Sequence, residues 1–127
     1  MKFIEIMYYN LFLDDERFPR QVTWVNLPLA EWQIVRSFNE FVETIKKQGV
    51  PNHISFDNDL SDFDAANAKT PNHQSKEKTG YDCAKFLVNY CQETNIKFPN
   101  YTVHSMNPVG KENIVALIEN YKRVYES

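Results

Sequence analysis

Short apolar segments alternate along the chain with longer segments in which apolar residues recur every three or four positions. Four of the short segments have the length and the β-branched or aromatic content of strands. They stay apolar until they end in polar residues, which indicates strands buried on both faces of a parallel sheet. The predicted strands are residues 10–14, 32–37, 53–57 and 101–105.

The three longer segments have the spacing of amphipathic helices. Each follows a residue whose side chain can accept hydrogen bonds from the free N–H groups of a first helical turn. The predicted N-caps are Ser37, Thr79 and Asn107, and the helices end near residues 49, 93 and 125.

Strands that alternate with helices predict an α/β fold, because parallel neighbours need crossover connections. We expect a mainly parallel sheet of about four or five strands, three main helices, and a single domain over residues 1–127. Residues 1–9 form an extension of the first strand or an additional edge strand. Residues 18–31 contain Pro19 and Pro28 and predict a loop where a regular fold has its first helix. The polar residues 61–78 predict a second, unusually long loop.

Composition narrows the classes of function. The formal charge is −3, from 14 Lys and Arg against 17 Asp and Glu, which argues against broad electrostatic binding of long nucleic acid. A small or short anionic ligand remains compatible with it. No apolar run is long enough to span a membrane, and Glu5 interrupts the N-terminal segment where a secretory signal would be apolar. We therefore expect a cytoplasmic protein.

Polar residues follow three of the four predicted strands. Because ligands of parallel sheets bind beyond the carboxyl ends of the strands, these residues are expected to converge at one edge. Carboxylates that meet there repel one another unless a cation lies between them. Oxygen ligands favour Mg²⁺ or Mn²⁺, and a histidine in the site would shift the preference toward Mn²⁺ or another transition metal. Alternatively, the acidic pair after the first strand caps a turn and faces water. The residues concerned are Asp14 and Asp15, Asp57 and Asp59, and His104 and Ser105.

The start of the third helix predicts an anion site at the same edge. Asn107 and Pro108 begin a helix with free N–H groups, Gly110 allows a close approach and Lys111 supplies charge. The alternative is an ordinary helix start without function. His104 is polar within a buried strand, so it is either a hydrogen-bonded core histidine or a general acid or base at the site.

Four blocks of the chain, taken in order, resemble the signature blocks of the cyclic-phosphate-processing receiver-like domains. This resemblance implies a receiver-like (flavodoxin-like) three-layer fold and a metal-dependent enzyme. The family is associated with RNA repair and with cyclic phosphates at RNA ends or in nucleotide derivatives, including those of ADP-ribose. The blocks, which span residue 10 to about residue 121, are LFLDDERFP, HISFDNDL, TGYDCAKFLV and TVHSMNPVGKENI.

The resemblance also implies roles for individual residues. Asn58 departs from the histidine common at this position of the family, which puts a metal ligand or proton donor in doubt. The implied mechanism is hydrolysis of a cyclic phosphodiester, with His104 protonating the leaving oxygen. The implied metal ligands are Asp14, Asp15, Asp57 and Asp59, the catalytic group includes His104, Asp57 and Ser105, and the phosphate-binding turn comprises Asn107, Gly110 and Lys111. Apart from the resemblance, the charge of Arg17 makes it a further candidate for phosphate binding, although most such charged residues only face water.

Two other functions remain open at this stage. A signalling receiver would accept phosphate on Asp57, although no further strand carrying the lysine of ordinary receivers follows the Ser105 strand end. A non-catalytic module would bind or sequester a cyclic nucleotide or another phosphorylated ligand through the same anion site.

Overall fold

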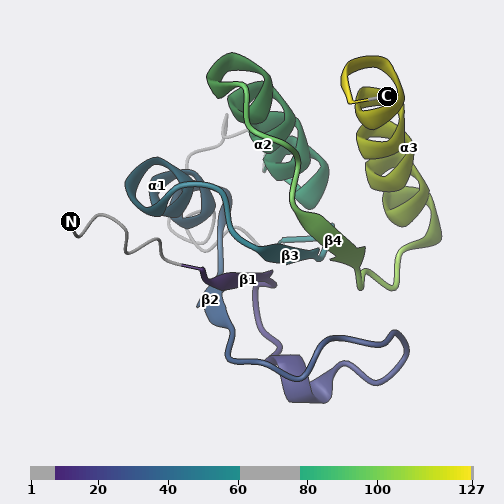
Figure 1. Ribbon diagram of the computed structural model, residues 1–127. Coiled ribbons are helices and arrows are strands. Elements are labelled where there is room, and N and C mark those ends of the chain that lie inside the picture. Colours follow the sequence, from purple (N-terminus) through teal and green to yellow (C-terminus); the bar gives the residue numbers. More distant parts are fainter. Residues whose placement is uncertain (1–7, 61–77, 127) are drawn as a thin grey trace, which may run out of the picture.

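The computed structural model describes residues 8–60 and 78–126. In this part of the chain, four parallel strands form one sheet in the order β2-β1-β3-β4 (Figure 1). All the carboxyl ends therefore lie at one edge, and the predicted α/β fold is confirmed. The strands are β1 (Asn10–Leu13), β2 (Gln33–Val35), β3 (His53–Phe56) and β4 (Asn100–Val103).

Three helices connect or follow the strands, and all three predicted N-caps are confirmed. The side chains of Ser37, Thr79 and Asn107 each accept a hydrogen bond from a backbone N–H of the following turn. The C-cap of the first helix is Gly49, whose φ is 87°. Glycine suits this position because residues with a Cβ atom rarely adopt such a positive φ. The helices are α1 (Phe38–Gln48), α2 (Gly80–Thr94) and α3 (Pro108–Tyr125).

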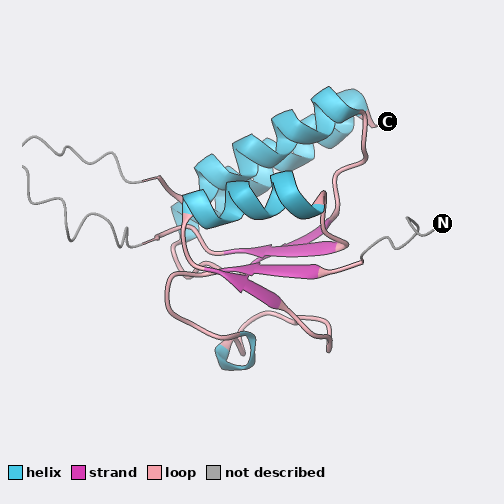
Figure 2. Ribbon diagram, turned by 90° about the vertical axis from the view of Figure 1, so that its left-hand side faces the viewer, coloured by secondary structure: helices cyan, strands magenta, loops and turns pink. Residues whose placement is uncertain are grey.

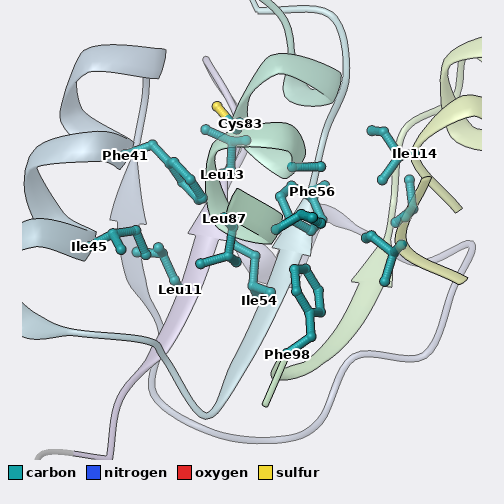
Figure 3. Packing of buried hydrophobic residues seen from close by; sticks show 14 of the residues in the cluster. Leu11, Leu13, Phe41, Ile45, Ile54, Phe56, Cys83, Leu87, Phe98 and Ile114 are labelled. Atoms are coloured by element: carbon teal, nitrogen blue, oxygen red, sulfur yellow. The ribbon is translucent and has the colours of Figure 1, made fainter. Parts of the chain in front are cut away.

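The helices lie together on one face of the sheet, which we call the helix-covered face (Figure 2). Because side chains alternate along a strand, Leu11 and Leu13 of β1 and Ile54 and Phe56 of β3 point toward these helices. Figure 3 shows them packed with side chains of α1 and α2, including Phe41. The main apolar core therefore lies between the sheet and the three helices.

The opposite face of the sheet is covered by the connection from β1 to β2, and we call it the loop-covered face (Figure 2). This connection contains one turn of 3-10 helix, η2 (Pro19–Gln21), and otherwise has no regular structure, as its prolines predicted. Its Val22 is buried, and Trp32 packs edge-on against Phe12 at 6.2 Å between ring centroids. The third layer of this receiver-like fold is thus a loop instead of a helix.

Two sequence predictions concern segments that lie largely outside the described residues. These are the strand extension within residues 1–9 and the long loop over residues 61–78. Tyr8 and Tyr9, which are described, precede β1 without regular structure. Among the described residues, no helix has the length and apolar character needed to cross a membrane.

Candidate active site

Asp14 directly follows β1 and organises the turn that carries the acidic pair. The side chain is fully buried, and its Oδ1 accepts hydrogen bonds from the backbone N–H of Glu16 at 2.9 Å and of Arg17 at 2.8 Å. Its Oδ2 pairs with Arg17 Nη1 at 3.3 Å. An aspartate that bonds the backbone two and three residues ahead closes a tight turn. The Asp14 carboxylate is therefore held in one orientation at the sheet edge.

His104 directly follows β4 and extends this arrangement across the sheet. Its Nε2 lies 3.0 Å from Asp14 Oδ2, and its Nδ1 lies 2.7 Å from Ser55 Oγ. Since a carboxylate only accepts, Nε2 carries the proton and the Ser55 hydroxyl can donate to Nδ1. The imidazole is fully buried and stacks on Phe12 at 4.6 Å between centroids. Both ring nitrogens of His104 therefore have hydrogen-bond partners, and the ring lies on the loop-covered face of the sheet.

The surroundings of Asp14 favour its charged form. Burial alone would raise the pKa of this carboxyl group, but the hydrogen bonds from His104 and from the N–H groups of Arg17 and Glu16 hold the pKa below its usual range. Asp14 is therefore a buried, ionised carboxylate at neutral pH.

Asp57 directly follows β3, the strand beside β1. Only 5% of its surface is exposed, and one oxygen accepts the backbone N–H of Asn58 at 2.8 Å. Among the described residues, no hydrogen bond reaches its other oxygen. Burial and the nearby charge of Asp14 raise the pKa of Asp57 to about 7, although the Asn58 N–H acts in the opposite direction. Two buried carboxyl groups therefore repel each other at the sheet edge.

This pair fits a divalent cation. Asp14, Asp57 and His104 each offer a ligand atom, and the three atoms lie within 4.8 Å of one another. A cation would relieve the repulsion and would use the carboxylate oxygen of Asp57 that has no hydrogen-bond partner in the described part of the chain. Because both nitrogens of His104 are occupied, the two carboxylates are the ligands available without rearrangement.

An open cleft of about 690 Å³ lies beside these carboxyl groups, and we call it the acidic cleft. Of the predicted site residues, it brings together Asp15, Arg17, Asp57, Asp59 and Asn107. Asp14, His104, Ser105, Gly110 and Lys111 are not among its lining residues. Its described lining consists of Asp15, Glu16, Arg17, Asp57, Asp59, Leu60, Thr79, Met106, Asn107 and Pro108.

The start of α3 closes one side of the acidic cleft. Asn107 Oδ1 accepts the N–H of Gly110 at 3.0 Å, while Nδ2 donates to both carboxylate oxygens of Asp59 at 3.3 Å. Ser105, which is 5% exposed, accepts the N–H of Asn107 at 3.0 Å and so shapes the turn before the helix. Lys111 is exposed on the first turn of α3. Asp59 is thus bonded to the α3 N-cap in this structure.

Gly110 has a packing role that its sequence context did not indicate. A Cβ atom at this position would lie 2.5 Å from the Asn58 side chain, so only glycine lets α3 approach so closely. Asn58 itself is 8% exposed and accepts the N–H of Tyr81 at 3.1 Å and, through its carbonyl, that of Gly80 at 2.8 Å. Asn58 therefore bonds the first turn of α2 and packs against α3.

Sequence reasoning missed two residues that hold the site together. Arg36 donates from Nη1 to the carbonyl oxygens of Asp14 at 3.1 Å and Arg17 at 2.7 Å. Trp24 donates from its indole N–H to the His104 carbonyl at 2.8 Å, and its ring lies 5.2 Å from the Arg17 guanidinium. Trp24 could have been found from the sequence, because a large aromatic side chain in a loop usually packs against a neighbouring surface of the protein. Arg36 carried no such signal.

Comparison with known protein families identifies the family of this chain. A family model described as "Cyclic-phosphate processing Receiver domain" matches residues 9–120, which include every described strand, the described lining of the acidic cleft and most of α3. Comparisons with curated proteins and with solved structures found no match. The match covers most of the chain and agrees with the parallel 2-1-3-4 sheet. The chain therefore belongs to the family of cyclic-phosphate processing receiver domains.

Proposed function

We propose that this protein is a metal-dependent hydrolase that opens a cyclic phosphodiester of a nucleotide, an RNA end or an ADP-ribose derivative. The observation that carries the proposal is the pair Asp14 and Asp57, two buried carboxyl groups: burial, together with the charge of Asp14, raises the pKa of Asp57 to about 7. Such a pair beside a cleft suits a divalent cation, and membership of the family supports a cyclic phosphate as the ligand.

Asp14 and Asp57 would hold the ion, with Asp15 and Asp59 at the cleft able to complete its surroundings. Oxygen ligands favour Mg²⁺ or Mn²⁺. When bound, the ion would supply positive charge for the phosphate and a lowered pKa for a bound water molecule.

The phosphate would be bound and oriented by this chain's own donors. Arg17 lines the cleft, and its ion pair with Asp14 and its contact with Trp24 fix the guanidinium in place. The α3 N-terminus at Asn107 directs its dipole toward the same cleft, and Lys111 adds charge from the first turn. These groups would stabilise charge that develops on the phosphate oxygens.

His104 is better suited to positioning than to the proton transfer predicted from the sequence. Its ring is fully buried, and its two nitrogens bond Asp14 and Ser55, so neither nitrogen faces the cleft. A histidine in this place orients a ligating carboxylate. The leaving oxygen would take its proton from water or from a carboxyl group of the cleft. Ser105 would act on the turn before α3 and not as a reacting group.

A turnover assay with purified protein tests the proposal. The panel contains a 2′,3′-cyclic nucleotide, RNA ending in a cyclic phosphate, ADP-ribose 1″,2″-cyclic phosphate and a cyclic dinucleotide, each with Mg²⁺, Mn²⁺ or chelator. We expect metal-dependent ring opening that Asp14→Asn reduces at least a hundredfold, on the order expected for loss of a metal ligand or its support. The exposed Glu93→Gln on α2 is the control and should keep full activity. Ring opening that persists in chelator would overturn the proposal.

A binding module is the second candidate, and Asn58 favours it. The residue at the position of the family histidine is committed to capping α2, and among the described residues no histidine lines the acidic cleft. Tight, metal-dependent binding of one panel member without any chemical change would support sequestration over hydrolysis.

A further inference from the structure

One wall of the acidic cleft is apolar and exposed. Its residues Met106 and Pro108 lie where the chain passes from β4 into α3. Met106 is 62% exposed, whereas Leu60, the other large apolar residue of the described lining, is 6% exposed. Packing in the core therefore accounts for Leu60 but not for Met106. In a cleft lined mainly by polar residues, an exposed apolar side chain suits an apolar part of the ligand.

Arg17 joins Met106 to a second exposed side chain, that of Trp24. The guanidinium donates from Nη2 to Met106 Sδ at 3.8 Å and lies 5.2 Å from the centroid of the Trp24 ring. Trp24 is 39% exposed, and its indole N–H is held by the His104 carbonyl. Both apolar side chains thus contact one guanidinium although neither is buried. We call Met106, Arg17 and Trp24 the cleft-rim platform.

The cleft-rim platform lies next to a carboxylate that would hold the metal. Arg17 Nη1 is 3.3 Å from Asp14 Oδ2, while Nη2 of the same guanidinium contacts Met106. Met106 is therefore separated from Asp14 by the width of one guanidinium. A nucleoside 2′,3′-cyclic phosphate can bridge a short span of this kind, because its base and its cyclic phosphate are attached to the same five-membered ribose ring.

The side chains of the platform are of the kinds that bind nucleobases. Bases stack on tryptophan rings and on guanidinium planes, and the polarisable thioether of methionine packs favourably against aromatic rings. Contacts of this kind tolerate every base, because each base has a π face, and they grow stronger with the stacked area. Met106, which lines the cleft, offers this surface to the ligand, and Trp24 supports Arg17 from outside the described lining.

We propose, on the basis of the proposed function, that the cleft-rim platform binds the nucleobase attached to the ribose that carries the cyclic phosphate. The preferred substrates are then nucleoside 2′,3′-cyclic phosphates and RNA ends of the same structure. ADP-ribose 1″,2″-cyclic phosphate is a poorer substrate, because the ribose that carries its cyclic phosphate bears no base. Met106 determines this specificity by direct contact with the base, and Trp24 is a positioning residue that acts through Arg17.

The test compares ligands with and without a base: 2′,3′-cyclic AMP, 2′,3′-cyclic UMP and the 2,3-cyclic phosphate of methyl riboside. All three carry one negative charge, so differences in charge do not enter the comparison. We measure kcat/KM at fixed free Mg²⁺ and dissociation constants by calorimetry. The base-free ligand should be poorer than 2′,3′-cyclic AMP by about tenfold in both quantities, and 2′,3′-cyclic UMP should lie between them.

Two variants assign the effect of the base to the platform. Met106→Ala should lower kcat/KM for 2′,3′-cyclic AMP about tenfold and leave the base-free ligand within about twofold of the wild type. The matched control is Val109→Ala, which truncates a similarly exposed apolar side chain on the first turn of α3, outside the described lining, and should change neither ligand. Equal losses for both ligands in Met106→Ala would overturn the base contact.

The outcomes separate this inference from the proposed function. If the base-free ligand is cleaved as well as 2′,3′-cyclic AMP, the base contact is wrong and the hydrolase stands. If the ligands bind without cleavage, the ratio of their dissociation constants decides the base contact, and the hydrolase is overturned. If no ligand binds or reacts, both proposals fail for this substrate class.

Discussion

The strands β1 and β3 bury different chemistry on their two faces. Toward the helices they direct aliphatic and aromatic side chains, among them Leu11, Ile54 and Phe56, into the main core. Toward the β1–β2 loop they direct Phe12 and Ser55, which are equally buried. In the described part of the chain, the second face places the hydroxyl of Ser55 and the imidazoles of His104 and His53 against the sheet.

This contrast separates stability from chemistry in the fold. On the helix-covered face, burial of apolar side chains stabilises the folded state. A polar group buried there without a hydrogen bond would destabilise it. The polar groups of the loop-covered face are hydrogen-bonded: the buried His104 to Ser55 and Asp14, and the half-buried His53 to Thr102 at 2.7 Å. A fully bonded polar network of this kind fixes side-chain orientation. We therefore expect mutations on the two faces to have different consequences.

Phe41→Ala should have the largest effect on stability and little on the site. Phe41 is fully buried on α1 and packs at 6.2 Å from Phe56 and 6.4 Å from Phe86 between ring centroids. Removing the ring should lower the free energy of unfolding by about 3–5 kcal/mol. Urea denaturation measures the loss, and Mn²⁺ affinity under folding conditions should stay within about twofold of the wild type. A large loss of metal affinity in folded protein would mean that the two faces are not separable.

Asp57→Asn should stabilise the metal-free protein at alkaline pH. The pKa of Asp57 is raised to about 7 in the folded state, against about 3.9 in the unfolded state, so the unfolded chain releases its proton first. Stability of the wild type therefore falls as pH rises from about 4 to about 7, and the amide removes this fall. We expect a gain of about 2 kcal/mol at pH 8 and a much smaller one at pH 4.

Denaturation curves in chelator at the two pH values measure this change. Equal effects of Asp57→Asn at pH 4 and pH 8 would contradict the burial and repulsion assigned to this carboxyl group. Glu93→Gln, an exposed carboxylate on α2, serves as the control and should show little change at either pH.

Ser55→Ala should weaken metal binding with a smaller loss of stability. The hydroxyl holds the imidazole of His104, which in turn holds Asp14, so its loss loosens a ligating carboxylate. We expect metal affinity to fall about tenfold and stability to fall by about 1 kcal/mol. The matched control is Thr102→Val, which removes a hydroxyl on the same face that bonds His53 and does not reach Asp14. Equal losses of metal affinity in the two variants would count against the network.

Trp24→Phe should have the smallest effect. It deletes the N–H that bonds the His104 carbonyl but keeps an aromatic ring near Arg17. We expect a stability loss of about 1 kcal/mol and a modest rise in KM with kcat little changed. Because Trp24 contacts Arg17, its fluorescence should also respond to phosphate ligands, and Trp32→Phe isolates that signal. A fluorescence change that comes from Trp32 alone would place the ligand elsewhere.

The sequence predicted the fold well because its signals are local. Continuous apolar runs, N-caps such as Asn107 and the two prolines of the β1–β2 loop each act within a few residues. The grouping of Asp14 with Asp57 was also predictable, since parallel strands bring their carboxyl ends to one edge.

The bonding partners of the site residues were not predictable. Because side chains alternate along a strand, His104 lies on the same, loop-covered face as Thr102. The register between β3 and β4 then brings Ser55 next to the imidazole. Alternation along β4 places the imidazole on the loop-covered face, and His104 is not among the residues that line the cleft. Gly110 likewise suggested access for a phosphate, whereas its neighbour in space is Asn58. Contacts of this kind depend on long-range packing, which no local pattern records.

The central claim is that Asp14 and Asp57 form a metal site and that Ser55 and His104, on the loop-covered face, orient Asp14. Titration of the chelator-treated protein with Mn²⁺, followed by calorimetry, tests this claim most directly. The wild type should bind Mn²⁺ at this site, Asp14→Asn and Asp57→Asn should each lose that binding, and Ser55→Ala should weaken it while Thr102→Val and Glu93→Gln leave it unchanged. Binding that is the same in the wild type and in both aspartate variants would contradict the account.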